Sequence, residues 1–123
     1  VSYTYQLSLD VTDKNSVTYL HQVAYFPVHS GNADLLLQWK DYGFTTSAFV
    51  VGSRYALNEN INANLLDPFL NVDLGLFALR KIRQHEFRIQ FTIKNLANAH
   101  YAYIRNYVMP GRNYLISLSY GFN

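Results

Sequence analysis

The side chains best suited to hold a metal ion or another ligand are the four histidines, His21, His29, His85 and His100. No pair of them has the spacing of helical metal ligands or of an HExxH motif, and the chain has no cysteine to add a thiolate. His21, His29 and His100 fall in long connecting segments, and His85 falls in a short turn. We therefore expect ordinary surface histidines, with ligand contact by the three in long segments as the alternative.

A tyrosine-rich stretch, Tyr101, Tyr103 and Tyr107, offers a second set of candidate contacts for a ligand or a surface partner. A tyrosine ring is apolar with a polar tip, so it also anchors at a membrane interface or packs within a loop. We expect packing or anchoring here, with ligand contact as the alternative.

The charged side chains carry no pattern typical of catalysis. No Ser/His/Asp elbow, phosphate-binding loop or glycosidase-like carboxylate pair is present, so we expect no enzyme and no cofactor. The net charge of +2 is small and the basic residues are scattered, which argues against nucleic acid as a partner. Acids and bases on the predicted strands are expected to pair along one wet face; they are Asp10, Asp34, Asp73, Lys40, Arg88 and Lys94.

Strands must position these residues, because the apolar pattern has a period of two. The last strand alternates most clearly, and small polar side chains occupy one of its faces. The other face carries Tyr114, Ile116, Leu118, Tyr120 and Phe122. Such a strand suits a wall between lipid and a water-filled lumen. Half of the residues are hydrophobic, yet the mean hydropathy is −0.08 and no apolar run reaches the roughly 18–20 residues of a membrane helix.

The same alternation predicts six strands, at residues 1–12, 32–40, 44–57 (with a bulge near Gly52), 68–80, 86–96 and 112–122. Their connections alternate between long (13–31, 58–67, 97–111) and short (41–43, 81–85). Bacterial outer-membrane barrels combine short periplasmic turns with long external loops in this way.

Aromatic side chains gather at the predicted strand ends, where a headgroup layer would lie. The expected periplasmic ends carry Tyr3, Trp39, Phe44, Phe87, Tyr120 and Phe122. The expected external ends carry Tyr55, Phe69 and Tyr114.

Several motifs of the second half follow one another in a recognisable order: a strand ending in Asn95-Leu96, then Tyr101, then Pro110-Gly111-Arg112, and a final Tyr120-Gly121-Phe122. Together with Val72-Asp73 and Tyr25-Phe26-Pro27-Val28-His29, this ordered set resembles the end of a TonB-dependent outer-membrane receptor. Each motif also has a structural interpretation, since Asn95 can cap a strand end and Pro110-Gly111 is ordinary turn chemistry.

The resemblance implies that residues 1–123 are a C-terminal segment of an antiparallel, up-and-down transmembrane β-barrel of about 22 strands. It implies a Gram-negative outer membrane and energy-coupled import of a scarce nutrient such as an iron chelate, haem or cobalamin. Implied partners are outer-membrane lipid, the remaining barrel and plug, the TonB complex through the missing N-terminal part, and the barrel-assembly machinery, which would read the terminal alternation. The loop residues His21, His29, His100, Tyr101, Tyr103 and Tyr107 would be the candidate cargo contacts.

Two other classes of protein fit the same alternation. A soluble β-barrel that binds a small apolar ligand would turn its apolar faces inward, and periodicity alone does not decide which face points outward. A porin-like barrel built from several chains would also fit the predicted strand pattern. In a membrane, six strands alone would leave two edges unpaired in hydrocarbon, so we expect further strands from elsewhere.

Overall fold

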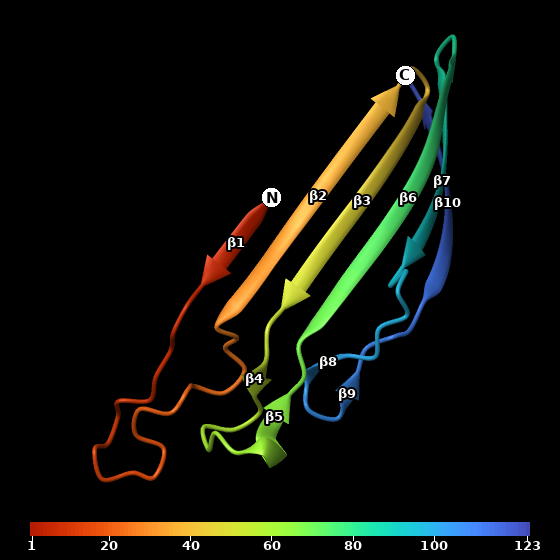
Figure 1. Cartoon of the computed structure of the whole chain (residues 1–123). Coiled ribbons are helices and arrows are strands. Elements are labelled where there is room, and N and C mark those ends of the chain that lie inside the picture. Colours follow the sequence, from red (N-terminus) through yellow and green to blue (C-terminus); the bar gives the residue numbers. More distant parts are fainter. The chain divides into compact units, whose positions relative to one another are not determined.

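The computed structural model describes residues 1–123. Its strands form one six-stranded sheet and two small two-stranded sheets. The strand order is β1-β2-β3-β6-β7-β10 (Figure 1), so the predicted all-β, up-and-down arrangement is confirmed. The bounds are β1 Ser2–Tyr5, β2 His29–Trp39, β3 Tyr42–Val51, β6 Phe69–Ile82, β7 His85–Lys94 and β10 Asn113–Phe122.

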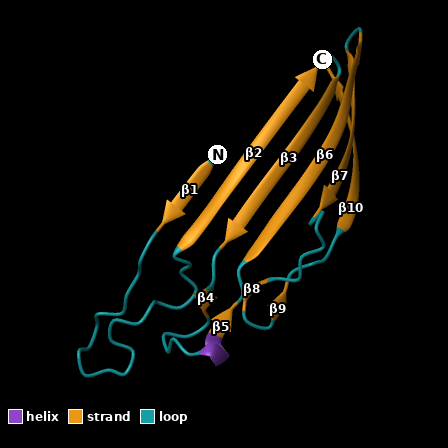
Figure 2. Ribbon diagram, viewed as in Figure 1, coloured by secondary structure: helices purple, strands orange, loops and turns teal.

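Short elements occupy the long connections. They are β4 Arg54–Tyr55, the 3₁₀ turn η1 Asn62–Asn64, β5 Leu65–Leu66, β8 Ala102–Ile104 and β9 Tyr107–Val108 (Figure 2). β4 pairs with β5 and β8 pairs with β9, each in a separate two-stranded sheet. None of the helical structure has the length and apolar character that crossing a membrane requires.

The chain divides into two compact units. The loop unit comprises residues 1–32, 49–70 and 100–109, and the sheet unit comprises residues 33–48, 71–99 and 110–123. Most of the long strands belong to the sheet unit, whereas the four short strands and β1 belong to the loop unit.

Two tight turns close the hairpins of the sheet unit. Lys40-Asp41 joins β2 to β3, and Arg83-Gln84 joins β6 to β7. Lys40 and Arg83 have φ angles of 52° and 55°, the positive values that two-residue hairpin turns favour at their first position. Both turns and the C-terminus lie at one end of these strands, called the turn end below (Figure 1).

The first predicted strand is much shorter than expected. β1 stops at Tyr5, and beyond it only the Leu9–Gln22 bridge and scattered backbone hydrogen bonds continue the pairing. At the far end of this loose pairing, the Asp10 carboxylate accepts hydrogen bonds from the Thr12 amide (3.0 Å) and the Thr18 hydroxyl (2.8 Å) and so stabilises the turn that follows. β2 correspondingly begins at His29, inside the predicted long connection.

The third predicted strand ends early at the glycine where irregularity was expected. β3 stops at Val51, and the Gly52 amide turns to the His29 carbonyl at 2.8 Å. A Cβ at position 52 would lie 3.0 Å from that carbonyl oxygen, so glycine permits this close approach. The residues predicted to continue the strand form the separate β4.

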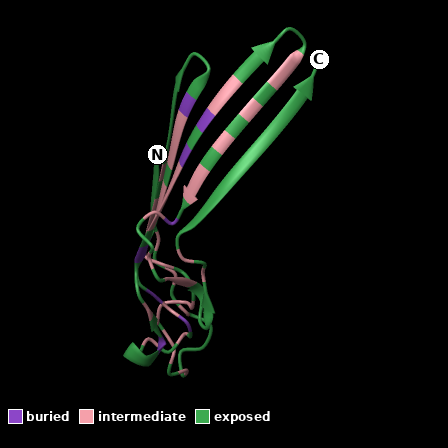
Figure 3. Cartoon of the chain, turned by 90° about the vertical axis from the view of Figure 1, so that its right-hand side faces the viewer, coloured by how far each residue is buried: buried purple, intermediate pink, exposed green.

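The apolar face of the sheet unit is more exposed than its polar face. On β7, the apolar side chains Phe87, Ile89 and Phe91 are 47%, 51% and 36% exposed, while the polar side chains that alternate with them are half-buried. β10 is exposed along its whole length (Figure 3). The larger part of the apolar surface of the sheet unit therefore has no cover within this chain.

Candidate functional site

The polar face of the sheet unit is packed and hydrogen-bonded. The Arg88 guanidinium lies 4.5 Å from the centre of the Phe77 ring, and it donates to Gln90 at 3.1 Å. Gln90 in turn donates to Thr92 at 3.3 Å. The Phe77 ring occupies the space above Gly43, where a Cβ would lie 2.0 Å from a ring carbon. Arg88, Gln90 and Thr92 thus form a hydrogen-bonded series beside the buried Phe77 ring.

The terminal strand carries the predicted alternation intact. β10 pairs antiparallel with β7 from Asn113–Lys94 to Phe122–His85. Tyr114, Ile116, Leu118, Tyr120 and Phe122 share its apolar face and are all exposed. Cross-strand ring contacts join Tyr114 to Phe91 and Tyr120 to Phe87, at centroid distances of 6.2 and 5.2 Å. Recognition of this strand as an assembly signal stays a prediction.

The Asn95 and Pro110-Gly111-Arg112 motifs meet in space and form a clamp. Asn95 is 2% exposed with φ 52°, and its amide N–H donates to the Asp73 carboxylate at 2.8 Å. Its side chain donates to the carbonyls of Ala99 (2.9 Å) and Pro110 (3.2 Å) and accepts from the Ala99 amide (2.8 Å). The clamp therefore fixes the entry of the chain into β10, which is the structural interpretation of the motif.

A second asparagine completes this clamp. Asn98 accepts a hydrogen bond from the Arg112 amide at 2.9 Å. A Cβ at Gly111 would lie 2.8 Å from the same Asn98 oxygen, so a larger residue there would push against it. Glycine in this motif permits the close approach of the Asn98 side chain to the backbone.

Arg54 is the central residue of the loop unit, and sequence reasoning did not single it out. It is 2% exposed and lies 5.5 Å from the centre of the Phe69 ring. Its Nη2 donates to the carbonyls of Ala102 and Tyr103 in the β8–β9 hairpin, while its buried Nη1 has no hydrogen-bond partner within the chain. Burial lowers the pKa of Arg54, an effect opposed by Tyr103 and Tyr25. A lone arginine between Ser53 and Tyr55 gives no periodic signal that would have revealed this role.

Two of the three predicted tyrosines join Arg54. Tyr101 stacks on Phe69 at 4.3 Å, and Tyr103 meets the same ring edge-on at 5.4 Å. Phe69 is buried, so it belongs to the interior of the loop unit and not to the expected aromatic belt. Tyr107 lies apart from this cluster as an exposed residue of β9.

The four histidines do not converge. The Nδ1 atoms of His21, His29 and His85 hydrogen-bond to the Asn58 carbonyl (3.1 Å), the Tyr3 hydroxyl (2.7 Å) and the Tyr120 hydroxyl (2.7 Å). His100 borders a shallow pocket of about 270 Å³ between the β4–β5 and β8–β9 segments, lined also by Leu65, Leu66, Asp67, Tyr101, Ala102 and Val108. No three His, Cys, Asp or Glu side chains are grouped to hold a metal ion.

The aromatic residues predicted for the turn end lie there except for Tyr3, although Phe44 of β3 is half-buried. Trp39, Phe87, Tyr120 and Phe122 are exposed there, and Tyr42 joins them. Tyr3 was expected at this end, but it pairs with Gly31 near the start of β2, because β1 covers only the first part of that strand. Its ring stacks on His29 instead.

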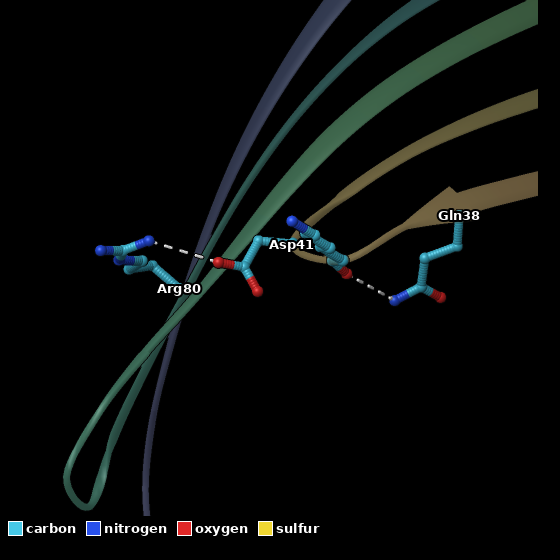
Figure 4. Close-up of polar contacts among 4 residues, drawn as sticks. Gln38, Asp41 and Arg80 are labelled. Carbon is cyan, nitrogen blue, oxygen red and sulfur yellow. Dashed lines mark hydrogen bonds and ion pairs between the residues drawn. The ribbon is translucent and has the colours of Figure 1, made fainter.

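Ion pairs also mark the turn end (Figure 4). Arg80 lies 3.3 Å from Asp41, and Gln38 donates to the Lys40 carbonyl at 3.4 Å. Lys81 and Glu86, which face each other across β6 and β7, are 3.0 Å apart. The Arg80 and Asp41 side chains are 74% and 51% exposed, so this pair is open to competition from other ions.

Comparison with known proteins shows a likeness to solved structures. No family model matches the sequence, and no curated protein matches it. Among solved structures, the chain is similar to BauA, the ferric preacinetobactin receptor of Acinetobacter baumannii, with a TM-score of 0.77 and 23% identity. The alignment covers 98% of this chain and 19% of that protein, so the chain spans about a fifth of its length. The likeness shows that the two share this part of the fold.

Proposed function

We propose that this chain is part of the barrel of a TonB-dependent outer-membrane receptor that imports a scarce nutrient, with an iron chelate as the first candidate. The polar face of the sheet would line the lumen, and the apolar face would meet lipid. The short turns 41–43 and 81–85 predicted from the sequence would lie in the periplasm, and the long connections outside the cell. In this proposal the chain binds and conducts a cargo and performs no catalysis, and it needs no resident cofactor.

One observation carries the proposal: the apolar side chains of β7 are more exposed than the polar ones beside them. A water-soluble protein hides its apolar face, because transfer of apolar surface from water is favourable by roughly 25 cal/mol per Å². A lipid-facing wall reverses this arrangement, with apolar side chains outward and polar side chains toward the lumen. The hydrogen-bonded series Arg88, Gln90 and Thr92 fits a wet lumen.

Two further observations support the family and the cargo class. Two motifs of the resemblance are in contact, because the Asn95 side chain donates a hydrogen bond to the Pro110 carbonyl. The fold is shared with a protein described as a ferric preacinetobactin receptor. The partners follow from the proposal: outer-membrane lipid, the remaining barrel strands at the open edges of β1 and β10, a plug, TonB and the barrel-assembly machinery.

The first experiment is to extract the membrane fraction of the source cells with detergent and to measure the mass of the denatured polypeptide that contains these peptides. A detergent-dependent species several times heavier than 14.2 kDa is the expected result. A detergent-independent species of 14.2 kDa would overturn the proposal in favour of the soluble barrel. A detergent-dependent species of that small mass would favour a barrel made from several chains.

The cargo class has its own experiment. Cells lacking the gene would be compared with the parent strain for uptake of labelled iron chelates, haem and cobalamin. We expect a selective loss of uptake of one iron chelate under iron limitation. Unchanged uptake of all three classes would contradict import of these nutrients while leaving the membrane location standing.

A further inference from the structure

We propose that a groove on the apolar face near the turn end binds one anionic phospholipid, with its phosphate at Arg80 and an acyl chain over Ala78. The inference rests on the proposed function, because it requires this face to meet the membrane. It adds a defined binding site to a surface that would otherwise be a general contact with lipid.

Small Ala78 produces the groove because the side chains around it are large. The hollow has a volume of about 360 Å³, and its lining includes Tyr42, Ala78, Arg80, Phe87, Ile89 and Leu118. Ala78 faces Ile89 across the β6–β7 pair, so the floor of the groove lies between larger side chains.

The groove continues along β6 away from the turn end. A second hollow of about 330 Å³ shares Tyr42, Ala78 and Ile89 with the first, and it adds Leu76 and Phe91. From Arg80 to Leu76 the strand advances roughly 13 Å, at about 3.3 Å per residue. This length accommodates a substantial part of an extended acyl chain, and the walls along it are apolar.

The charge at the head of the groove favours a phosphate. Arg80 borders the first hollow, and its only ion-pair partner is the exposed Asp41 carboxylate at 3.3 Å. The two turns and adjoining strand ends carry the bases Lys40, Arg80, Lys81 and Arg83 against the acids Asp41 and Glu86, an excess of positive charge. A guanidinium binds phosphate through paired N–H donors, and basic residues at a membrane surface attract anionic lipid.

Aromatic rings frame the same site. Tyr42 and Phe87 line the first hollow together with Tyr120, whose hydroxyl is held by His85 at 2.7 Å. Such rings prefer the boundary between headgroups and hydrocarbon, which places Arg80 at phosphate depth. An anionic glycerophospholipid matches both ends of the groove, because it joins one phosphate to apolar chains.

The test uses the intact outer-membrane protein that contains this chain, purified in mild detergent and incubated with phosphatidylglycerol. Native mass spectrometry then counts the retained lipid. We expect one retained phospholipid, with retention reduced about tenfold in Arg80→Gln, as loss of a charge-assisted hydrogen bond predicts. Ala78→Phe, which fills the groove, should reduce retention similarly.

Matched variants separate the site from its surroundings. Arg83→Gln removes a cation from the same end without touching the groove, and Leu35→Phe adds a ring on the apolar side of β2 outside it. Both should retain the lipid. Neutral diacylglycerol, offered in place of phosphatidylglycerol, should be retained weakly and without dependence on Arg80.

Each contrary result has a separate meaning. A detergent-dependent protein that retains no lipid, or retains it equally in Arg80→Gln and Ala78→Phe, overturns the phospholipid site and leaves the proposed function intact. Equal retention of diacylglycerol overturns the role of Arg80. A protein that purifies without detergent contradicts the proposed function itself, whatever the result with lipid.

Discussion

Arg54 shows how one side chain organises a segment that has little regular structure. The β8–β9 hairpin contains only short strands, and its carbonyls at Ala102 and Tyr103 reach inward to the same guanidinium. Hydrogen bonds to a charged group contribute about 1.5–3 kcal/mol, so removing this donor should free the hairpin.

We predict that Arg54→Leu in the intact protein exposes the hairpin to trypsin after Arg105. Cleavage there should be at least about a hundredfold faster than in the parent, because the two bonds to the guanidinium together contribute about 3 kcal/mol or more to the local opening equilibrium. Arg83→Leu is the control, since Arg83 lies in a turn of the sheet unit. Equal cleavage of Arg54→Leu and the parent would contradict the role of Arg54.

Asp10 gives a prediction about pH at the same scale. Hydrogen bonds from the Thr12 amide and then the Thr18 hydroxyl hold the pKa of Asp10 below its ordinary value of 3.8. Because the folded-state pKa is lowered, the contribution of this carboxylate is complete above pH 3.8 and is lost as pH falls through the folded-state pKa. Acid should therefore loosen the turn between Asp10 and Leu20.

Pepsin, which acts in acid, can measure this loosening by its cleavage at Tyr19-Leu20. In Thr18→Val, which lacks one of the donors, cleavage should begin at a higher pH than in the parent protein. Ser53→Ala, outside this turn, is the control. Identical pH profiles for the parent and Thr18→Val would disprove the assignment.

At the scale of elements, strands that depend on local alternation were predicted from the sequence. Elements that depend on contacts with distant residues were not. β6, β7 and β10 were predicted within a few residues, because their side chains alternate strictly between an apolar and a polar face. The long first strand was wrong, because period two says nothing about the facing segment, where Leu20 and Tyr25 have positive φ angles of 63° and 64° and interrupt the ladder. The β8–β9 hairpin was not predicted, because it depends on Arg54, about fifty residues earlier in the chain.

In the candidate site, too, local patterns were visible in the sequence and contacts with distant residues were not. Tyr101 and Tyr103 were singled out by their spacing, and their packing in the loop unit agrees with the preferred interpretation. Their partner Phe69 was placed wrongly, since an aromatic residue at a strand end has the same local pattern whether it faces lipid or a neighbouring loop. The clamp at Asn95 was visible as a motif, but its partners required the structure.

Replacement of Asn95 tests the clamp. Asn95→Ala removes three side-chain hydrogen bonds and places a less suitable residue at φ 52°. The free energy of unfolding should fall by about 2–4 kcal/mol, measured by urea denaturation of the intact protein in detergent. Asn95→Gly, which tolerates the positive φ, should recover part of the loss, and Asn98→Ala should cost less. A change under about 0.5 kcal/mol in Asn95→Ala would contradict a structural clamp.

At the scale of the whole molecule, the sheet is open. β1 and β10 are its edges, and unpaired strand edges are not stable in hydrocarbon. The apolar face adds to the problem, since only Val51, Ala56, Phe69 and Phe77 among the apolar residues are buried. In the proposed receptor, strands supplied from outside this chain would pair with both edges.

We therefore predict that residues 1–123, expressed alone and refolded into detergent, do not form a compact monomer. A folded β-barrel migrates differently on a gel before and after heating, and this difference should be absent. A heat-sensitive monomer would contradict the prediction. A heat-sensitive oligomer would instead support a barrel assembled from several copies.

The Phe77 ring above Gly43 also has an evolutionary consequence. Any side chain at position 43 would collide with that ring, so a substitution there is tolerable only if position 77 becomes smaller. Arg88, whose guanidinium lies 4.5 Å from the centre of the same ring, would lose this contact at the same time. Among related chains, these three positions should therefore change together: glycine with phenylalanine and arginine, or a bulkier residue at 43 with a small one at 77.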